Sequence, residues 1–176
     1  MSKWKTMRLF AMTLAVGAEV AMPTHAQPGP TTPSVQAPAL TAADYIEIQQ
    51  LVARYAYALD TQGGSGSAYA ALFIPDGAFG ATKGRDQLAA LARTAQPQRT
   101  GPSYTRSFLA NVMINPSPEG ATGSQYYVAI DVGEDGKSST LVEGGRFDDV
   151  YVKTADGWRF KSRTLTPSKT GGSPAQ

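Results

Sequence analysis

Two hydrophobic periods, one after the other, constrain what this chain can fold into. Between Thr41 and Ala95 the apolar residues recur at the spacing of α-helices, whereas from Tyr104 onward apolar and polar residues alternate as in strands. Turn sequences at 116–120, 134–136 and 155–157 separate four long strand segments, so we expect hairpins. Helices followed by an antiparallel meander predict an α+β domain in which a curved sheet wraps against the helices.

The first helix is the clearest element. Thr41 is a good N-cap residue, and Asp44 lies near the positive end of the helix. Its apolar face should be buried and comprises Tyr45, Ile48, Leu51, Val52, Tyr55 and Leu59. Residues 74–77 have the composition of a turn. We expect helices at 41–60, 68–73 and 84–95, a short strand starting at 78–79, and strands at 104–115, 121–132, 139–154 and 158–166.

The N-terminus has the pattern of a secretory signal at residues 1–26. Lys3, Lys5 and Arg8 precede a mostly apolar run, and residues 24–26 offer a cleavage site. We therefore expect a periplasmic or secreted protein. Glu19 interrupts the apolar run, so a lipid-anchored or interfacial helix is the alternative. A membrane span is not expected, because the run is shorter than the ~20 residues that a bilayer requires.

The rest of the chain divides into three parts. Residues 27–40 contain four prolines and no charge, which predicts an extended linker. Residues 41–167 form one domain of ordinary size, and 168–176 are expected to be a disordered tail. Without residues 1–26 the chain carries 13 basic and 13 acidic side chains, so no nucleic-acid-binding charge remains.

Histidine and cysteine are absent beyond the signal, since His25 is the only histidine and there is no cysteine. A Ser-His-Asp triad is therefore impossible after cleavage. No carboxylate cluster has calcium-loop spacing, and no glycine-rich loop joins a strand to a helix in the manner of phosphate sites. We expect no metal and no cofactor.

Several phrases of the sequence together resemble the SnoaL-like group of the nuclear transport factor 2 superfamily. They are IQQLVARYAYALD at 48–60, YAALFIPDG at 69–77, GRD at 84–86 and YVKTADGWRFKSR at 151–163. The resemblance implies a cone-shaped α+β barrel that encloses one deep, mostly apolar pocket. It also implies a function among cofactor-free dehydratases, dehydrochlorinases, isomerases and polyketide cyclases, or among members that only bind or dimerise.

The resemblance also implies site residues. Tyr55 and Asp60 match a tyrosine and an aspartate of dehydratase-like relatives, in which the aspartate orients a histidine. Ser107 stands where that histidine is expected, so the usual Asp-His base is absent. Asp60 is then the best candidate for a general base that removes a carbon-bound proton, and Tyr55, Tyr104, Tyr126 and Tyr127 are possible oxyanion donors. Alternatively, Asp60 ends the helix by bonding local backbone and Tyr55 is a core residue.

Strand alternation gives a separate view of the first long strand. One face mixes apolar and hydrogen-bonding side chains and suits a pocket wall: Ser107, Leu109, Asn111 and Met113. The other face is apolar and suits a helix or a partner: Phe108, Ala110, Val112 and Ile114. With Tyr127, the residues Ser107, Leu109 and Asn111 are our expected substrate contacts.

Arg163 matches a position that faces the cavity in some relatives, where it would hold an acidic or carbonyl substrate. Alternation instead places Arg163 with Arg159 and Lys161 on a solvated face, unless a bulge intervenes. Glu143 and Arg146 flank a Gly-Gly pair that favours a bend, where they could form an ion pair, and they are second-tier site candidates.

Two classes of function remain open. The first is a cofactor-free lyase or isomerase that acts on a hydrophobic cyclic molecule with Asp60 as base. The second is a non-catalytic module that binds an apolar ligand or forms a homodimer through the open sheet face, which is common in the family. A structural accessory domain is a third reading.

Overall fold

The computed structural model describes residues 39–60, 65–95 and 104–168, all within one compact unit, Val35–Gln176. The predicted signal at 1–26, nearly all of the linker and residues 169–176 of the tail lie outside the described residues. Within the described ranges, no helix has the length and apolar character needed to cross a membrane.

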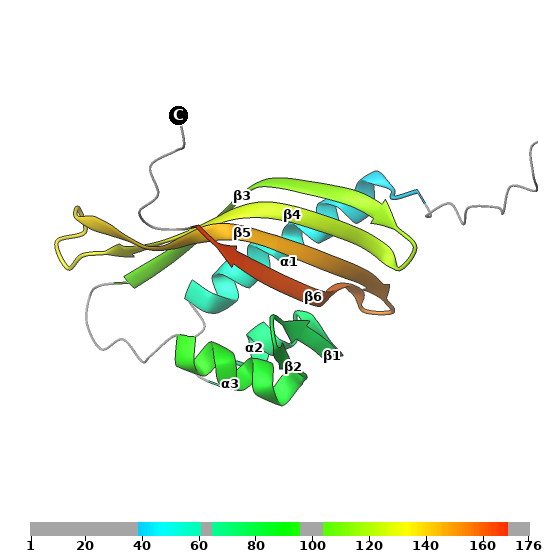
Figure 1. Cartoon of the computed structure of the whole chain (residues 1–176), viewed down its shortest axis with the longest axis horizontal. Coiled ribbons are helices and arrows are strands. Elements are labelled where there is room, and N and C mark those ends of the chain that lie inside the picture. Colours follow the sequence, from blue (N-terminus) through cyan, green and yellow to red (C-terminus); the bar gives the residue numbers. More distant parts are fainter. Residues whose placement is uncertain (1–38, 61–64, 96–103, 169–176) are drawn as a thin grey trace, which may run out of the picture. The chain divides into compact units, whose positions relative to one another are not determined.

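The predicted order of helices and strands is confirmed (Figure 1). Helix α1 is followed by the short helix α2, the strand pair β1–β2, helix α3 and four long strands. The bounds are Ala42–Asp60 for α1, Ser67–Ala70 for α2, Phe73–Phe79 for β1, Thr82–Lys83 for β2, Arg85–Ala95 for α3, Tyr104–Ser117 for β3, Gly120–Val132 for β4, Ser139–Thr154 for β5 and Gly157–Pro167 for β6. The fold is thus of the expected α+β class.

The turn expected at residues 74–77 is instead part of β1. The strand pairs with β6 at Phe73 and again at Ala78, and the register shifts between these two positions. Four residues of β1, 74–77, therefore lie between these two pairs, whereas only Lys161 of β6 lies between Phe160 and Ser162. The turn-forming sequence produces an irregularity within the strand, and α2 is accordingly shorter than predicted.

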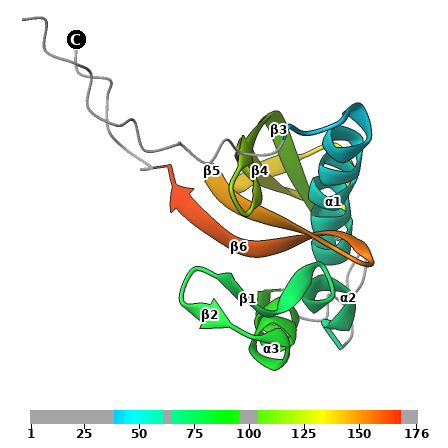
Figure 2. The ribbon, with the colours of Figure 1, turned by 90° about the vertical axis from the view of Figure 1, so that its right-hand side faces the viewer.

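The sheet has the order β2-β1-β6-β5-β4-β3. Strands β3 to β6 form an antiparallel meander, whereas β1 runs parallel to β6. Figure 2 shows α1 lying across one face of the curved meander, and we call this the inner face. Fully buried aromatic side chains fill the space between helix and sheet, including Phe73, Phe147, Tyr151 and Phe160. Burial of each such ring stabilises the fold by about 1.5–3 kcal/mol.

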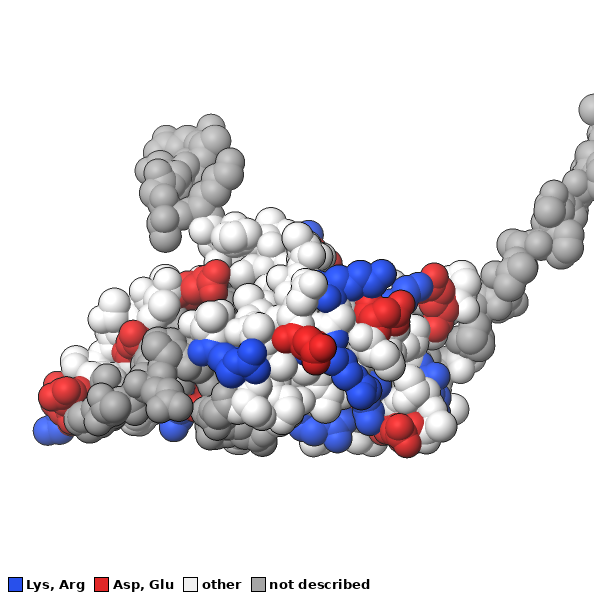
Figure 3. All heavy atoms as spheres, turned by 90° about the horizontal axis from the view of Figure 1, so that it is seen from below, with Lys and Arg blue, Asp and Glu red and all other residues white. Residues whose placement is uncertain are grey.

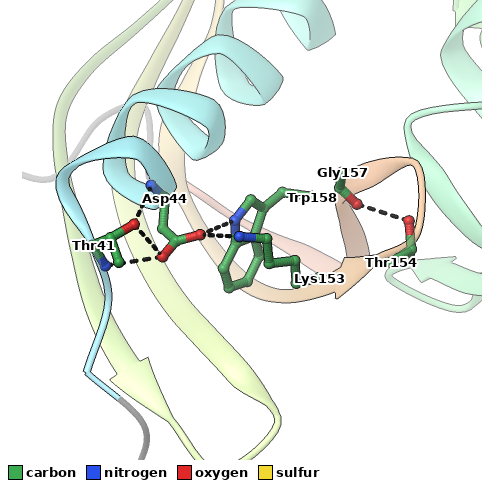
Figure 4. Close-up of polar contacts among 6 residues, drawn as sticks. All are labelled: Thr41, Asp44, Lys153, Thr154, Gly157 and Trp158. Carbon is green, nitrogen blue, oxygen red and sulfur yellow. Dashed lines mark hydrogen bonds and ion pairs between the residues drawn. The ribbon is translucent and has the colours of Figure 1, made fainter.

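Asp44 connects the start of α1 to the β5–β6 hairpin (Figure 4). Thr41 donates to its Oδ2 from the backbone nitrogen at 2.9 Å and from Oγ1 at 2.7 Å, and the Asp44 amide donates back to Thr41 Oγ1 at 3.2 Å. Its Oδ1 accepts from Lys153 Nζ at 2.6 Å and from Trp158 Nε1 at 3.0 Å. The hydrogen bonds from Lys153 and Thr41 hold the pKa of Asp44 well below its ordinary value.

Candidate functional site

Asp60, the last residue of α1, is bound to the sheet through Ser107. Asp60 Oδ2 accepts a hydrogen bond from the backbone nitrogen of Ser107 on β3 at 2.7 Å. Asp60 therefore accepts a hydrogen bond from backbone, as the alternative interpretation expected. The donor, however, lies on a strand 47 positions away and not at the end of its own helix. Both side chains are half-buried. The contact fixes the carboxylate between the end of α1 and the first strand of the meander.

Tyr127 joins these two residues to form what we call the Asp60 group: Asp60, Ser107 and Tyr127. Tyr127 is 7% exposed, and its ring centroid lies 4.8 Å from that of Phe147. Burial raises the pKa of the Tyr127 phenol, a hydrogen bond with Ser107 opposes the rise, and the negative charges of Glu143 and Asp60 add to it. The phenol stays protonated at neutral pH and can donate a hydrogen bond beside the Asp60 carboxylate.

Arg163 is completely buried, so the solvated face expected for it is wrong. The reason is a bulge in β6. Val150 pairs with Ser162 and Tyr151 pairs with Phe160, which leaves Lys161 as an extra residue between them. Because one extra residue reverses the alternation, Lys161 stays exposed while Arg163 points inward.

The buried guanidinium is paired with Asp149. Arg163 Nε donates to Asp149 Oδ1 at 2.8 Å, and Nη2 donates to Oδ2 at 2.7 Å. Gln125 Nε2 and the Tyr151 hydroxyl also donate to Oδ2, each at 2.7 Å. We call these four residues, together with Tyr55, the Arg163 group. Such an ion pair in the interior is balanced closely against the cost of desolvation, so stability alone is a weak reason for its presence.

Three aromatic rings enclose the guanidinium. Its central carbon lies 4.0 Å from the ring centroid of Tyr55, 4.2 Å from that of Phe160 and 4.5 Å from that of Phe147. Within the described part of the chain, two buried atoms of this group have no hydrogen-bond partner: Arg163 Nη1 and Gln125 Oε1. Leaving a buried polar atom unpaired is costly, so this donor and this acceptor mark a place suited to a polar group of a ligand or to water.

The tyrosines beside Arg163 are neutral over the physiological range. Burial raises the pKa of Tyr55 to about 12, although the positive charge of Arg163 and a hydrogen bond from Tyr69 oppose the rise. Burial and the proximity of Tyr55 raise the pKa of Tyr69 further. Tyr55 is only 2% exposed, and its ring lies 5.3 Å from that of Tyr69. Tyr55 is thus a core residue that also lies against the guanidinium of Arg163.

Phe147 contacts both the Asp60 group and the Arg163 group. Its ring centroid lies 4.8 Å from that of Tyr127 and 4.5 Å from the central guanidinium carbon of Arg163. Both groups therefore lie where α1 packs on the inner face, and the sequence-predicted residues Tyr55 and Asp60 of α1 meet Ser107, Tyr127 and Arg163 of the sheet there. The arrangement provides a carboxylate and a buried cation in the same part of the fold, with aromatic rings beside them.

The alternation predicted for β3 holds only up to a bulge. Leu109 is half-buried against the core, as expected for the inner face. The register then shifts between Ala110 and Met113, and Asn111 has a φ of 57°, in the left-handed region. Asn111 is exposed and Met113 is 62% exposed, whereas the next inward residue is Val112. Asn111 is therefore not part of the inner face, because the bulge turned its side chain to solvent.

The sequence interpretation missed Asp149, Gln125 and Tyr69. A signal for Asp149 existed, because Phe147, Asp149 and Tyr151 alternate on one face of β5 and an acid between two aromatic residues is unusual there. The ion pair expected between Glu143 and Arg146 is also wrong, since Arg146 Nη2 pairs with Asp148 at 2.9 Å. Across the described ranges, no cluster of three acidic, histidine or cysteine residues has the arrangement of a metal site.

A comparison with known proteins gives these features a context. A family model described as the SnoaL-like domain matches residues 40–164. No curated protein matches the chain at a significant level.

Three solved structures illustrate the likeness. A protein from Catenulispora acidiphila in complex with S-DNPA is 26% identical with a TM-score of 0.61, over 72% of this chain and 95% of that chain. An NTF2-like protein with a cystatin-like fold from Novosphingobium aromaticivorans is 25% identical with a TM-score of 0.58, over 70% and 80%. A protein of the same organism assigned as a scytalone dehydratase is 22% identical with a TM-score of 0.59, over 76% and 90%.

Proposed function

Because the chain belongs to the SnoaL-like domain family and has the NTF2-like fold, we propose that it binds a hydrophobic cyclic molecule on the inner face and acts as a cofactor-independent lyase or isomerase. The observation that carries this proposal is the position of Asp60, which the Ser107 amide holds at 2.7 Å beside the protonated Tyr127. A carboxylate fixed next to a hydrogen-bond donor is the arrangement that proton abstraction beside a carbonyl requires.

In the proposed reaction Asp60 removes a proton from a carbon next to a carbonyl group. The electron pair of the C–H bond moves toward the carbonyl oxygen, and the hydroxyl of Tyr127 donates a hydrogen bond to that oxygen. In a dehydration, the electron pair returns to expel the hydroxyl group on the carbon β to the carbonyl, and the proton held by Asp60 passes to that hydroxyl so that water leaves. In an isomerisation, Asp60 returns the proton to another carbon of the conjugated system. Neither route needs a histidine in the position of Ser107.

Arg163 would bind a second oxygen atom of the ligand. Its Nη1 is a buried donor that no described residue satisfies, and the neutral hydroxyl of Tyr55 lies in the same group. Because Asp149 already balances the charge of Arg163, the site suits a carbonyl or phenol oxygen. The rings of Phe147 and Phe160 supply the apolar surface for the body of the ligand.

Relatives support a small-molecule ligand. The Catenulispora protein was solved in complex with S-DNPA, and one Novosphingobium protein is assigned as a scytalone dehydratase. The presence of Ser107 in place of the expected histidine favours a second candidate, binding of the same class of ligand without turnover, because a serine hydroxyl does not accept a proton near neutral pH.

We also propose a homodimer formed through the outer face of β3 and β4. Exposed apolar side chains lie opposite one another there: Phe108 pairs with Val128, and Ala110 pairs with Tyr126. Phe108, Val128 and Tyr126 are 54%, 38% and 59% exposed, an unusual density of apolar surface for a monomer.

The proposed location is the periplasm or the exterior, and the intact mass of the exported protein tests it, since a mass that includes residues 1–26 would contradict cleavage.

A ligand screen on the purified exported protein tests the function. Steroid-like, terpenoid and aromatic polyketide compounds are added to the wild type, Asp60→Asn and Asp76→Asn, and thermal stabilisation and product formation are measured. Asp76 is an exposed aspartate on β1, so Asp76→Asn is the matched control. We expect a compound that all three proteins bind but that only Asp60→Asn fails to convert. A compound that the wild type binds and does not convert would leave the binding module as the function.

A further inference from the structure

A cleft of about 430 Å³ is lined by residues outside the two groups described above. Its walls come from α1, from the segment between α2 and β1, and from the start of β6. Its lining includes Glu47, Arg54, Leu72, Asp156, Trp158 and Arg159. None of these residues belongs to the Asp60 group or the Arg163 group. The volume is within the range of small-molecule sites, so the cleft is large enough for a ligand of its own.

Four charged side chains line this cleft and do not neutralise one another. Glu47 and Asp156 are acidic, Arg54 and Arg159 are basic, and in the described part of the chain no ion pair joins any two of them. The lining thus carries two charges of each sign. Figure 3 shows the same character more widely, since basic and acidic side chains are interspersed on the face seen from below. A lone anion or cation would meet as much repulsion as attraction here.

Two head groups of opposite charge, those of Arg159 and Glu47, lie near Gly157. A Cβ atom on Gly157 would lie 3.8 Å from Arg159 Nη1 and 4.0 Å from Glu47 Oε2. Gly157 has a φ of 93°, which favours glycine, and its missing side chain leaves the space between the two head groups open. The guanidinium is fixed there, because Arg159 Nη1 donates to the Trp158 carbonyl at 2.9 Å.

The walls of the cleft are held in place before any ligand arrives. Thr154 Oγ1 donates to the Gly157 carbonyl at 2.8 Å and accepts from the Asp156 amide at 3.2 Å, which fixes the turn. Trp158 Nε1 donates to Asp44 on α1 at 3.0 Å (Figure 4). These bonds join the hairpin to the helix that carries Glu47 and Arg54. A prearranged site of this kind loses little entropy on binding.

We propose that this cleft binds a small zwitterion of the α-amino acid type. The carboxylate of the ligand pairs with Arg159, its ammonium group pairs with Glu47, and its side chain packs against Leu72. Arg54 and Asp156 provide a second pair of opposite charges for the same two groups. The two ligand charges of an amino acid are attached to one carbon, which suits head groups that lie near a single glycine.

Amide spectra of the isotopically labelled protein test the proposal with three probes that differ only in charge: L-leucine, 4-methylpentanoate, which lacks the ammonium group, and isoamylamine, which lacks the carboxylate. We expect L-leucine to shift the Gly157 amide resonance saturably. Each singly charged probe should bind at least about tenfold more weakly, because one of the two charge pairs is lost. Equal binding of all three probes, or no saturable shift with L-leucine, overturns the proposal.

Two variants assign the charges. Arg159→Gln and Glu47→Gln should each reduce L-leucine affinity by about tenfold or more, whereas Lys161→Gln should leave it unchanged because Lys161 points away to Glu119, at 2.6 Å. Retained affinity in both variants overturns the proposal. Asp60→Asn should bind L-leucine as the wild type does, so this result is independent of the reaction proposed for the inner face.

Discussion

Arg163 and Asp149 form a two-point ion pair in which both side chains are fully shielded from solvent, with contacts of 2.8 and 2.7 Å. The pair lies between the sheet and α1, under the ring of Tyr55. It connects two strands, β5 and β6, at the level where the aromatic core meets the inner face. Both carboxylate oxygens of Asp149 accept hydrogen bonds, whereas Nη1 of Arg163 has no hydrogen-bond partner. This asymmetry makes Arg163 the half of the pair that has capacity for a ligand.

Removal of one partner should destabilise the fold strongly. Asp149→Asn leaves the guanidinium buried without its countercharge, at an expected cost of about 3–5 kcal/mol. The double variant Arg163→Met with Asp149→Leu should recover much of that loss, because no charge remains buried. Urea unfolding measures the free energy of unfolding of the single and the double variant. The neighbouring Asp148→Asn is the control, since Asp148 pairs with Arg146 at the surface and the expected loss is about 0–1 kcal/mol. A single variant as stable as this control would contradict the burial of the pair.

Stability should fall at alkaline pH because of the buried tyrosines. Burial raises the pKa of Tyr55 to about 12 and raises that of Tyr151 as well, whereas an unfolded tyrosine titrates near ~10. The native state therefore holds protons that the unfolded state has lost. The contribution is fully present below about pH 10 and is lost as pH rises through the folded pKa. Urea midpoints at increasing pH should decline in the wild type and more gently in Tyr55→Phe. Midpoints that stay constant above about pH 10 would contradict this.

The fold was predictable because its signals are periodic and repeated. The apolar spacing of the first helix repeats over many residues, and turn sequences separate four strands. Each element is therefore indicated by several residues at once. The Gly144–Gly145 pair also indicated irregularity, and the register between β4 and β5 does shift close to it, between Ala129 and Ile130. Gly145 is required there because a Cβ would approach Thr166 O to 2.5 Å.

The site was less predictable because two single-residue bulges reverse the faces of its strands. Lys161 turns Arg163 inward, and the bulge at Asn111 turns that residue outward. Neither position carries a glycine or a proline, so no local signal marks them. The partner of Arg163 could not be inferred either, because Asp149 meets it through pairing of two strands and not through spacing along one. Alternation is reliable only as far as the register remains regular.

Asp44→Asn should lower the thermal midpoint, because Asp44 connects α1 to Lys153 and Trp158. The hydrogen bond with Lys153 is the largest cause of its lowered pKa. Its stabilising contribution is therefore present above the unfolded value near ~3.9 and is lost as pH falls toward the folded value. The difference in midpoint between wild type and variant should be full at neutral pH and shrink below about pH 4. Asp76→Asn, an exposed change, should show no such difference, and an equal effect of both variants would contradict the role of Asp44.

The outer face of the sheet should make the protein dimeric. Phe108 on β3 and Val128 on β4 lie opposite each other and are both exposed, so a second copy that covers them removes adjoining apolar surface from water. Light scattering should give the mass of a dimer for the wild type and of a monomer for Phe108→Glu. Ile46→Glu is a matched control, because Ile46 is 59% exposed on α1, an element separate from this face. It introduces the same charge and should leave the dimer intact. A monomeric wild type, or dissociation by both substitutions alike, would show that this apolar face has another purpose, such as contact with a different protein.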